Sequence, residues 1–205
     1  MDAHRLTIRR ECPGDYDAVE HLTREAFWNV YRPGCTEHYI VHVLRGDPAL
    51  VPELDLVLER DGRLIGHILY MRAELRTDDG RTLPVMTFGP LSIHPDFQRR
   101  GCGKFLLERS LEMARDLGAG AVCIEGNPDF YGKSGFVAAS TRGIRCHGAP
   151  PSPFFLLREL QPGFLDGAAG VYYTPQGYFI DEARAEAFDR AFPPKLRQKL
   201  PGQLF

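Results

Sequence analysis

The chain has 205 residues, of which 43% are hydrophobic and 25% are charged, a composition typical of one globular domain with a sizeable core. It carries 25 lysine and arginine residues against 27 acidic residues, which gives a formal net charge of −2. This near-neutral balance gives no electrostatic reason to expect nucleic acid or an anionic membrane as a partner.

The cysteines and the apolar pattern indicate the compartment. The five cysteines are scattered and none forms a C-x-x-C pair, which argues against a disulfide framework and against a zinc site. The opening segment MDAHRLTIRR lacks the apolar run of a signal peptide. No later stretch approaches the roughly 20 apolar residues of a membrane span. We therefore expect a cytoplasmic protein.

The N-terminal part predicts a strand over residues 6–9 followed by two helices. Pro13-Gly14 precedes the first helix, for which Asp15 is the expected N-cap. The second helix is expected over residues 36–44, with Thr36 as its cap and a Gly-Asp-Pro sequence after it.

An antiparallel meander is expected next. Apolar alternation predicts strands over residues 54–59, 64–75 and 83–93, and Asp-Gly dipeptides in the two connecting turns supply the positive φ angles that tight hairpins need.

The pattern then changes to a parallel unit. Residues 101–117 form an amphipathic pattern that ends at Gly118, and a short apolar strand is expected over residues 121–125. A strand, a helix and a second strand in this order predict a right-handed parallel crossover. The fold class is therefore α/β, with a mixed sheet of α+β character. Further elements are expected over residues 129–133 and 181–191 (helices) and over residues 136–139 and 154–160 (strands).

The start of the long amphipathic helix carries the clearest functional pattern. Free amide groups and the helix dipole make such a helix start attractive to anions, and Gly101 and Gly103 let a phosphate approach the backbone. Arg99, Arg100 and Lys104 add positive charge, so the segment is suited to a pyrophosphate. The alternative is an ordinary turn with solvated arginines. The spacings of a dinucleotide-binding fingerprint and of a P-loop are both absent.

Two motifs here are similar to those of a known family. Gln98-x-x-Gly101-x-Gly103 resembles the Q/R-x-x-G-x-G/A signature of GNAT N-acetyltransferases, and Tyr131-x-x-x-Gly135-Phe136 resembles their second landmark. Residues 83–136 carry this match, the element order over residues 6–160 is consistent with the GNAT fold, and residues 126–131 resemble an uncharacterised bacterial-type subgroup.

The resemblance implies acetyl-CoA as co-substrate and no metal. In the family two central parallel strands splay apart at a bulge, here expected near Gly89-Pro90, and the pantetheine arm lies in the gap. The main chain expected to pair with pantetheine is that of Leu91, Ser92 and Ile93. The residues expected at the pyrophosphate are Gln98, Arg99, Arg100, Gly101, Cys102, Gly103 and Lys104.

The implied chemistry is direct attack of an amine on the thioester. A backbone N–H near Leu91 would stabilise the oxyanion, and Tyr131 matches the family tyrosine that protonates the departing thiolate. The alternative for Tyr131 is a packing role. Glu125 and His67 are candidates for the base, and each is open to a purely structural interpretation. Asn127 lies too close to Tyr131 to take over the usual family asparagine role.

Other residue groups are set aside. His38 and His42 have a spacing that can hold a metal, but no third ligand is evident. Cys102 lies at a helix start, where thiol pKa values fall, yet it occupies a variable slot of the signature. An aromatic group could line an acceptor pocket but fits plain packing better: Tyr172, Tyr173, Tyr178 and Phe179.

We therefore expect a GNAT domain over residues 1–162 and a C-terminal extension over residues 163–205. The expected activity is acetyl transfer from acetyl-CoA to a primary amine of a small molecule or a protein. The alternative is a non-catalytic acyl-CoA sensor or an interaction module. A homodimer is left open, and neither nucleic acid nor a membrane is expected as a partner.

Overall fold

The computed structural model describes residues 6–203, which form two compact units. Unit 1 comprises the described residues up to Leu69, then Pro90–Leu106, and the described residues from Gly177 onward. Unit 2 comprises Tyr70–Gly89 and Leu107–Gln176. Three elements run from one unit into the other: β3 (Arg63–Thr77), β4 (Thr82–Ile93) and α3 (Cys102–Asp116).

Unit 1 contains the antiparallel start of the sheet. Strand β1 (Leu6–Arg10) pairs with β2 (Leu56–Arg60), and β2 pairs with the first part of β3. The hairpin between β2 and β3 turns at Asp61 and Gly62, both with positive φ (52° and 79°), as an Asp-Gly hairpin requires. This part of the predicted meander is confirmed.

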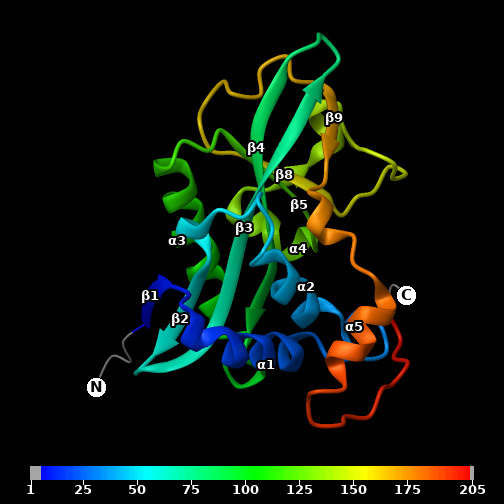
Figure 1. Cartoon of the computed structure of the whole chain (residues 1–205). Coiled ribbons are helices and arrows are strands. Elements are labelled where there is room, and N and C mark those ends of the chain that lie inside the picture. Colours follow the sequence, from blue (N-terminus) through cyan, green and yellow to red (C-terminus); the bar gives the residue numbers. More distant parts are fainter. Residues whose placement is uncertain (1–5, 204–205) are drawn as a thin grey trace. The chain divides into compact units, whose positions relative to one another are not determined.

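The helices of unit 1 are α1 (Tyr16–Phe27), α2 (Glu37–Leu44) and α5 (Glu182–Asp189), and α2 packs against both of the others (Figure 1). Both predicted N-cap positions are confirmed, although the side-chain hydrogen bonds that usually accompany such residues are not formed. Asp15 and Thr36 occupy the N-cap positions, but neither side chain makes a capping hydrogen bond. The Asp15 carboxylate instead accepts from the Arg9 guanidinium at 2.6 and 2.9 Å.

Unit 2 contains the predicted parallel pair. Strand β4 runs parallel to β5 (Ala121–Glu125), with Met86 opposite Val122, and β5 is antiparallel to β8 (Phe155–Glu159). Strand β8 also pairs with β6 (Val137–Ala138). The hydrogen-bonded strand order is β1-β2-β3-β4-β5-β8-β6, which confirms a mixed sheet.

Two strands of unit 2 were not predicted from the sequence. They are β7 (Ile144–Cys146) and β9 (Gly170–Tyr173), which run parallel to each other, while β9 is antiparallel to the second part of β3. Gly170 explains the close approach to β3, because a Cβ at this position would lie 2.2 Å from the Arg76 carbonyl oxygen.

The remaining helices are short and lie between the longer elements. Helix α4 spans Pro128–Tyr131. Six 3-10 helices lie at Pro13–Asp15, Pro52–Leu54, Pro95–Phe97, Gly132–Ser134, Ala139–Arg142 and Gln176–Tyr178 in the described chain.

The boundary expected between residues 162 and 163 stays a prediction. Residues 1–5 and 204–205, at the ends of the two expected domains, lie outside the described residues. In the structure the C-terminal extension contributes β9 to unit 2 and α5 to unit 1. The buried core of unit 2 includes β9 through Tyr172, which packs with Phe155 at 5.3 Å between ring centroids.

Candidate functional site

The loop between β4 and α3 lies in unit 1 and turns sharply before the helix. After β4 ends at Ile93 and the Pro95–Phe97 turn follows, Arg99 and Gly101 both adopt positive φ angles of 58° and 84°. A positive φ is unusual for a non-glycine residue such as Arg99. These two left-handed residues form a tight turn immediately before α3.

Gln98 ties this loop to the end of the strand. Its side-chain Nε2 donates to the carbonyl oxygen of Ile93 at 3.0 Å. The first residue of the predicted signature therefore positions the loop through its side chain, a role that the sequence did not reveal. Its contribution to an anion site would come from its main chain.

The start of α3 has the properties of an anion-binding site. The helix runs for 15 residues, and its first amides have no intrahelical acceptor, while its dipole places roughly half a positive charge there. Arg99, Arg100 and Lys104 are exposed beside it. Cys102 is buried, with 5% of its surface exposed, so only its main chain is available to a ligand.

The end of β4, also in unit 1, holds its side chains inward. Ser92 is fully buried, and its hydroxyl donates to Thr23 Oγ1 at 2.9 Å. Ile93 is buried as well, whereas Leu91 is half-buried. Just before this segment, Gly89 has a φ of 135° within the strand, an irregularity at the position where the sequence predicts a bulge.

Tyr131 lies in unit 2 within an aromatic cluster. Its ring centroid is 4.8 Å from that of Phe130, 5.6 Å from Phe136 and 5.8 Å from Phe88. A Cβ at Gly126 would lie 2.3 Å from Tyr131 Cε2. The ring is therefore held in place on several sides, and a glycine at position 126 is required for its present position.

Asn127 begins the helix that carries Tyr131. Its Oδ1 accepts from the amide of Asp129 at 2.8 Å, which is the geometry of an N-cap. This local role accounts for the asparagine four positions before the tyrosine.

A second tyrosine supports the aromatic cluster from within unit 2. Tyr70 is fully buried, its ring lies 5.1 Å from Phe88, and its hydroxyl is 2.8 Å from Ser110 Oγ. Burial raises the pKa of Tyr70 far above its ordinary value. Tyr70 is thus a structural residue, one that the sequence patterns did not single out.

The two candidate bases have different environments. His67 is fully buried, with Nε2 2.9 Å from Asp55 Oδ1, so it cannot meet a substrate from solvent. Glu125 is the last residue of β5 and is exposed. Of the two candidates, only Glu125 is exposed to solvent.

His67 belongs to a buried charge cluster in unit 1. Ligand atoms of Glu11, Asp55 and His67 all lie within 4.8 Å of one another, a group that could hold a cation. Arg45 already donates to both Glu11 oxygens, at 2.9 and 2.8 Å. Burial raises the pKa of Glu11, and the Arg45 hydrogen bonds oppose that shift. The cluster is therefore accounted for as an internal ion-pair network.

The remaining histidine and aromatic candidates lie in different parts of the structure. His42 contacts Glu20 at 3.0 Å, whereas His38 Nε2 lies 3.1 Å from Asp189 Oδ1. Tyr172 is buried in the unit 2 core, and Phe179 is 65% exposed in unit 1. These positions form neither a shared metal site nor one aromatic pocket within the described residues.

Comparison with known proteins identifies the family. A family model described as an acetyltransferase (GNAT) domain matches residues 7–139. This chain belongs to the GNAT family. It is therefore classed with the acyltransferases, and the predicted resemblance and fold class are confirmed.

Individual relatives agree with this assignment. An uncharacterized N-acetyltransferase, YjhQ of Escherichia coli (strain K12), is 30% identical over 136 residues, which is 66% of this chain and 72% of that protein. The GNAT N-acetyltransferase YhbS of Escherichia coli, solved in complex with CoA, superposes with a TM-score of 0.76 at 26% identity, over 87% of this chain and 94% of that one. A GNAT acetyltransferase of Brucella melitensis, solved with acetyl-CoA, gives 0.67 at 26% identity, over 85% and 99%.

None of the helices in the described range 6–203 is both long enough and apolar enough to cross a membrane.

Proposed function

We propose that this GNAT chain transfers an acetyl group from acetyl-CoA directly to a primary amine of a small molecule or a protein. The observation that carries the proposal is the loop over residues 98–104, where two left-handed residues and a helix start present amides and positive charge together. The CoA and acetyl-CoA complexes of the two similar structures support the same ligand for this chain.

The cofactor is proposed to bind mainly through backbone. The amides of residues 98–104 bind the pyrophosphate, with Arg99, Arg100 and Lys104 adding charge. The main chain of residues 91–93 pairs with the pantetheine amides. Since Ser92 directs its hydroxyl to Thr23, its contribution is limited to its peptide groups.

The reaction moves one acyl group and requires two proton transfers. The free amine attacks the carbonyl carbon and forms the C–N bond of a tetrahedral intermediate. This intermediate then collapses to the amide as the carbonyl re-forms and the C–S bond breaks. The amide N–H of Leu91 stabilises the oxyanion, a contribution typically worth about 3 kcal/mol. Tyr131 protonates the leaving thiolate. The exposed Glu125 carboxylate takes the proton that the amine loses.

One observation favours a second candidate function, that of a non-catalytic acyl-CoA sensor. His67, one of the two candidate bases, is fully buried. Glu125 is then the one remaining candidate of the two, and a chain in which Glu125 does not act as a base would bind acyl-CoA without turnover. Steady-state release of CoA with any amine acceptor would exclude this alternative.

We further propose a cytoplasmic location. All five cysteines are free: Cys12 is exposed, Cys146 is half-buried, and Cys35, Cys102 and Cys123 are buried. Free thiols are typical of a reducing compartment. Assembly into a homodimer stays a prediction, which size-exclusion chromatography with light scattering can check.

The cofactor site is tested by isothermal titration with acetyl-CoA. We expect binding by the wild-type protein and loss of binding in a Gly101→Val, Gly103→Val double variant. Gly118→Val is the matched control, because Gly118 also has a positive φ (94°) and open space around its Cβ, but lies at the other end of α3. Equal binding by a folded double variant would show that the loop is only a turn.

A further inference from the structure

The hairpin between β2 and β3 lies at the same end of the sheet as the loop that follows β4, and both belong to unit 1 (Figure 1). The amide of His94 donates to the carbonyl oxygen of Ile65 at 2.9 Å. A Cβ at Gly66 would lie 3.2 Å from the carbonyl oxygen of Ser92. The start of β3 is therefore packed against the end of β4, just before the loop over residues 98–104 that we propose binds the pyrophosphate.

Positive charge is concentrated at this end of the sheet. Residues 60–63 and 94–104 contain five lysine or arginine residues and two aspartates, whereas the whole chain has a formal net charge of −2. Three of the five basic residues, Arg99, Arg100 and Lys104, belong to the loop proposed for the pyrophosphate. The other two are Arg60 and Arg63 on the hairpin, to which the proposed reaction assigns no role.

Arg60 and Arg63 are held near each other without a tightly bound carboxylate. They are directly opposite each other in the β2–β3 pair, an arrangement in which like charges destabilise the strands. Arg60 Nε lies 3.9 Å from Asp61 and Arg63 Nη2 lies 3.8 Å from Asp96, so neither ion pair is a hydrogen bond. An anion that contacts both guanidinium groups would relieve their repulsion.

The ring of Phe97 holds both arginines beside the loop. The guanidinium carbon of Arg60 lies 5.5 Å from the ring centroid and that of Arg63 lies 5.2 Å from it, within the range of a cation–π interaction. Phe97 is half-buried and directly precedes Gln98. The two guanidinium groups are therefore positioned next to the first residue of the proposed pyrophosphate loop.

His94 adds a further donor beside Arg63. A neutral imidazole has one acceptor nitrogen, and His94 Nδ1 accepts from the amide of Asp96 at 3.3 Å. The other ring nitrogen, Nε2, therefore carries the proton, and it lies 3.3 Å from Arg63 Nη2. Because a guanidinium has no acceptor, both groups are donors, and an anionic oxygen can accept from the two together.

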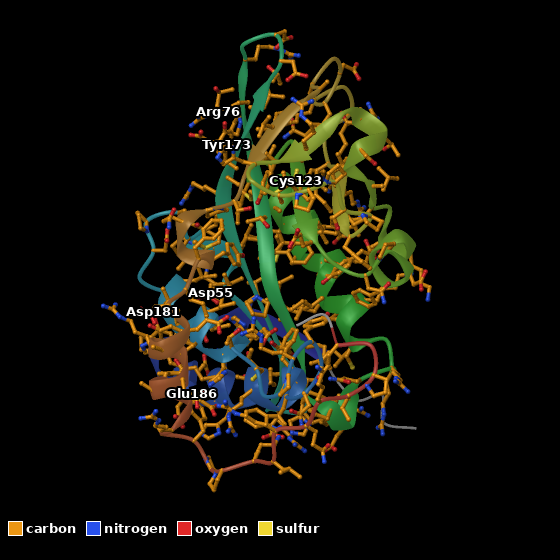
Figure 2. All side chains as sticks on the ribbon, turned by 90° about the vertical axis from the view of Figure 1, so that its right-hand side faces the viewer. Asp55, Arg76, Cys123, Tyr173, Asp181 and Glu186 are labelled. Atoms are coloured by element: carbon orange, nitrogen blue, oxygen red, sulfur yellow. The ribbon has the colours of Figure 1, made fainter. Side chains whose placement is uncertain are left out.

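Another arginine of the chain shows the same ring contact with a different ionic partner. In unit 2, Arg76 lies over Tyr173 (Figure 2), with its guanidinium carbon 4.3 Å from the ring centroid. Its Nη2 also donates to Glu74 Oε2 at 3.1 Å. The carboxylate hydrogen bond that completes this arrangement at Arg76 is replaced at Arg60 and Arg63 by the longer ion pairs given above.

We propose that Arg60 and Arg63, held by Phe97, form a subsite for the 3′-phosphate of CoA. The subsite rests on the proposed function, since it supposes that the pyrophosphate of acetyl-CoA binds at residues 98–104. CoA carries its pyrophosphate on O5′ and a phosphomonoester on O3′ of the same ribose, so the two groups are one sugar apart. A phosphomonoester has nearly two negative charges at neutral pH and three acceptor oxygens, which suits two guanidinium groups that each donate in a fork.

The test compares CoA with 3′-dephospho-CoA, which lacks only this phosphate. Isothermal titration of the full chain measures the affinity for each ligand. We expect the wild type to bind CoA about tenfold more tightly than 3′-dephospho-CoA, because the charge-assisted hydrogen bonds to the phosphate are lost in the second ligand.

Variants assign this difference to the hairpin. Arg60→Gln and Arg63→Gln should each weaken the binding of CoA by about threefold or more and leave the affinity for 3′-dephospho-CoA unchanged, which also shows that the variants are folded. The matched control is Arg10→Gln. Arg10 lies in the same unit at the other end of the β1–β2 pair, and it likewise has a long ion pair, 3.9 Å to Glu53. This variant should keep the wild-type affinities for both ligands.

The outcomes separate the subsite from the proposed function. Equal affinities of the wild type for CoA and 3′-dephospho-CoA, or hairpin variants that weaken both ligands alike, would overturn the subsite and leave the proposed function standing. Binding of neither ligand would overturn both. Inorganic phosphate is the probe for a free anion. If phosphate binds alone, Arg63→Gln abolishes that binding, and the wild type binds the two cofactors alike, then the arginines serve a free phosphate and the subsite is overturned.

Discussion

Tyr131 is the side chain on which the proposed chemistry depends most, and its packing can be separated from its hydroxyl. The ring contacts with Phe88, Phe130 and Phe136 involve only its carbon atoms, so Tyr131→Phe should keep the cluster intact. We expect kcat to fall by about 10²-fold or more with an unchanged affinity for acetyl-CoA. The measurement is a pH series of kcat, in which the limb caused by loss of the acid should disappear. Tyr173→Phe is the control, and equal losses in both variants would contradict an acid role.

A separate prediction concerns Gly126, which lies against the Tyr131 ring. A methyl group at this site would lie 2.3 and 2.6 Å from Tyr131 Cε2 and Cδ2, too close for carbon atoms to coexist. Gly126→Ala must therefore displace the tyrosine, and we expect kcat to fall by about tenfold or more while acetyl-CoA binding is kept. Steady-state kinetics and isothermal titration measure the two effects. Gly132→Ala, where a Cβ meets nothing within 4 Å, should retain activity; if it matched Gly126→Ala, the displacement argument would fail.

Between elements, the hydroxyl pair of Tyr70 and Ser110 links β3 to α3 within unit 2. Ser110 donates to the Leu107 carbonyl at 2.8 Å and lies 2.8 Å from the Tyr70 hydroxyl, so Tyr70 is assigned as the donor of this pair. Tyr70→Phe removes that donor and leaves Ser110 with its own acceptor, which should cost about 1 kcal/mol of unfolding free energy. Ser110→Ala leaves a buried tyrosine hydroxyl without this partner and should cost more, about 1–3 kcal/mol. Urea denaturation of both variants gives the order, and the reverse order would refute this assignment.

Elements with a long apolar pattern could be predicted from the sequence, and short ones could not. The alternation in β3 and β4 and the amphipathic face of α3 are each many residues long, so their type is well determined. In contrast, β7 has three residues and β9 four, and their pairing depends on the close approach at Gly170 rather than on local preference. Tertiary contacts, rather than local sequence preference, therefore determine where β7 and β9 form.

Side-chain partners within the candidate site show the same limit. The glycines and positive charge around Gly101 are visible in the sequence because they depend on backbone conformation and local charge. The bond from Gln98 to Ile93 and the burial of His67 beside Asp55 depend on which segments meet in the fold. The sequence alone therefore indicated the loop that we propose binds the pyrophosphate. It indicated neither the side chain that holds this loop nor which base candidate is buried.

At the scale of the whole chain, residues near the C-terminus complete the packing of residues near the N-terminus in unit 1. Arg24 and Asp189 are 165 positions apart and form a buried ion pair. Asn29 binds the same C-terminal segment by donating to the Leu196 carbonyl at 3.0 Å and accepting from the amide of Gln198 at 3.1 Å. These contacts therefore hold α5 and the segment after it against α1 and the residues that follow α1.

The last prediction concerns His38, which is fully buried between Asp189, Cys35 and the rings of Phe188 and Phe192. Burial lowers the pKa of His38 from 6.5 to about 4, although Asp189 opposes that shift and Arg24 adds to it. Between these two values the unfolded chain binds a proton more readily than the folded chain. The contribution of His38 is therefore complete above pH 6.5 and is lost as the pH falls to about 4, a change on the order of 3 kcal/mol.

The predicted loss of stability on acidification can be tested by urea denaturation across this pH range. The measurement compares the unfolding free energies of the wild type and of His38→Gln. Glutamine cannot take up the proton, so we expect the variant to lose less stability than the wild type as the pH falls. Arg24 lowers the pKa of Asp189 despite the burial of this carboxylate, so protonation of Asp189 destabilises both proteins in acid. Because this effect is present in both curves, the difference between the curves reports mainly on His38. His147→Gln is the control, because His147 is exposed, and its curve should follow that of the wild type. Parallel curves for His38→Gln and the wild type would mean that His38 takes up its proton equally well in the folded and unfolded chains.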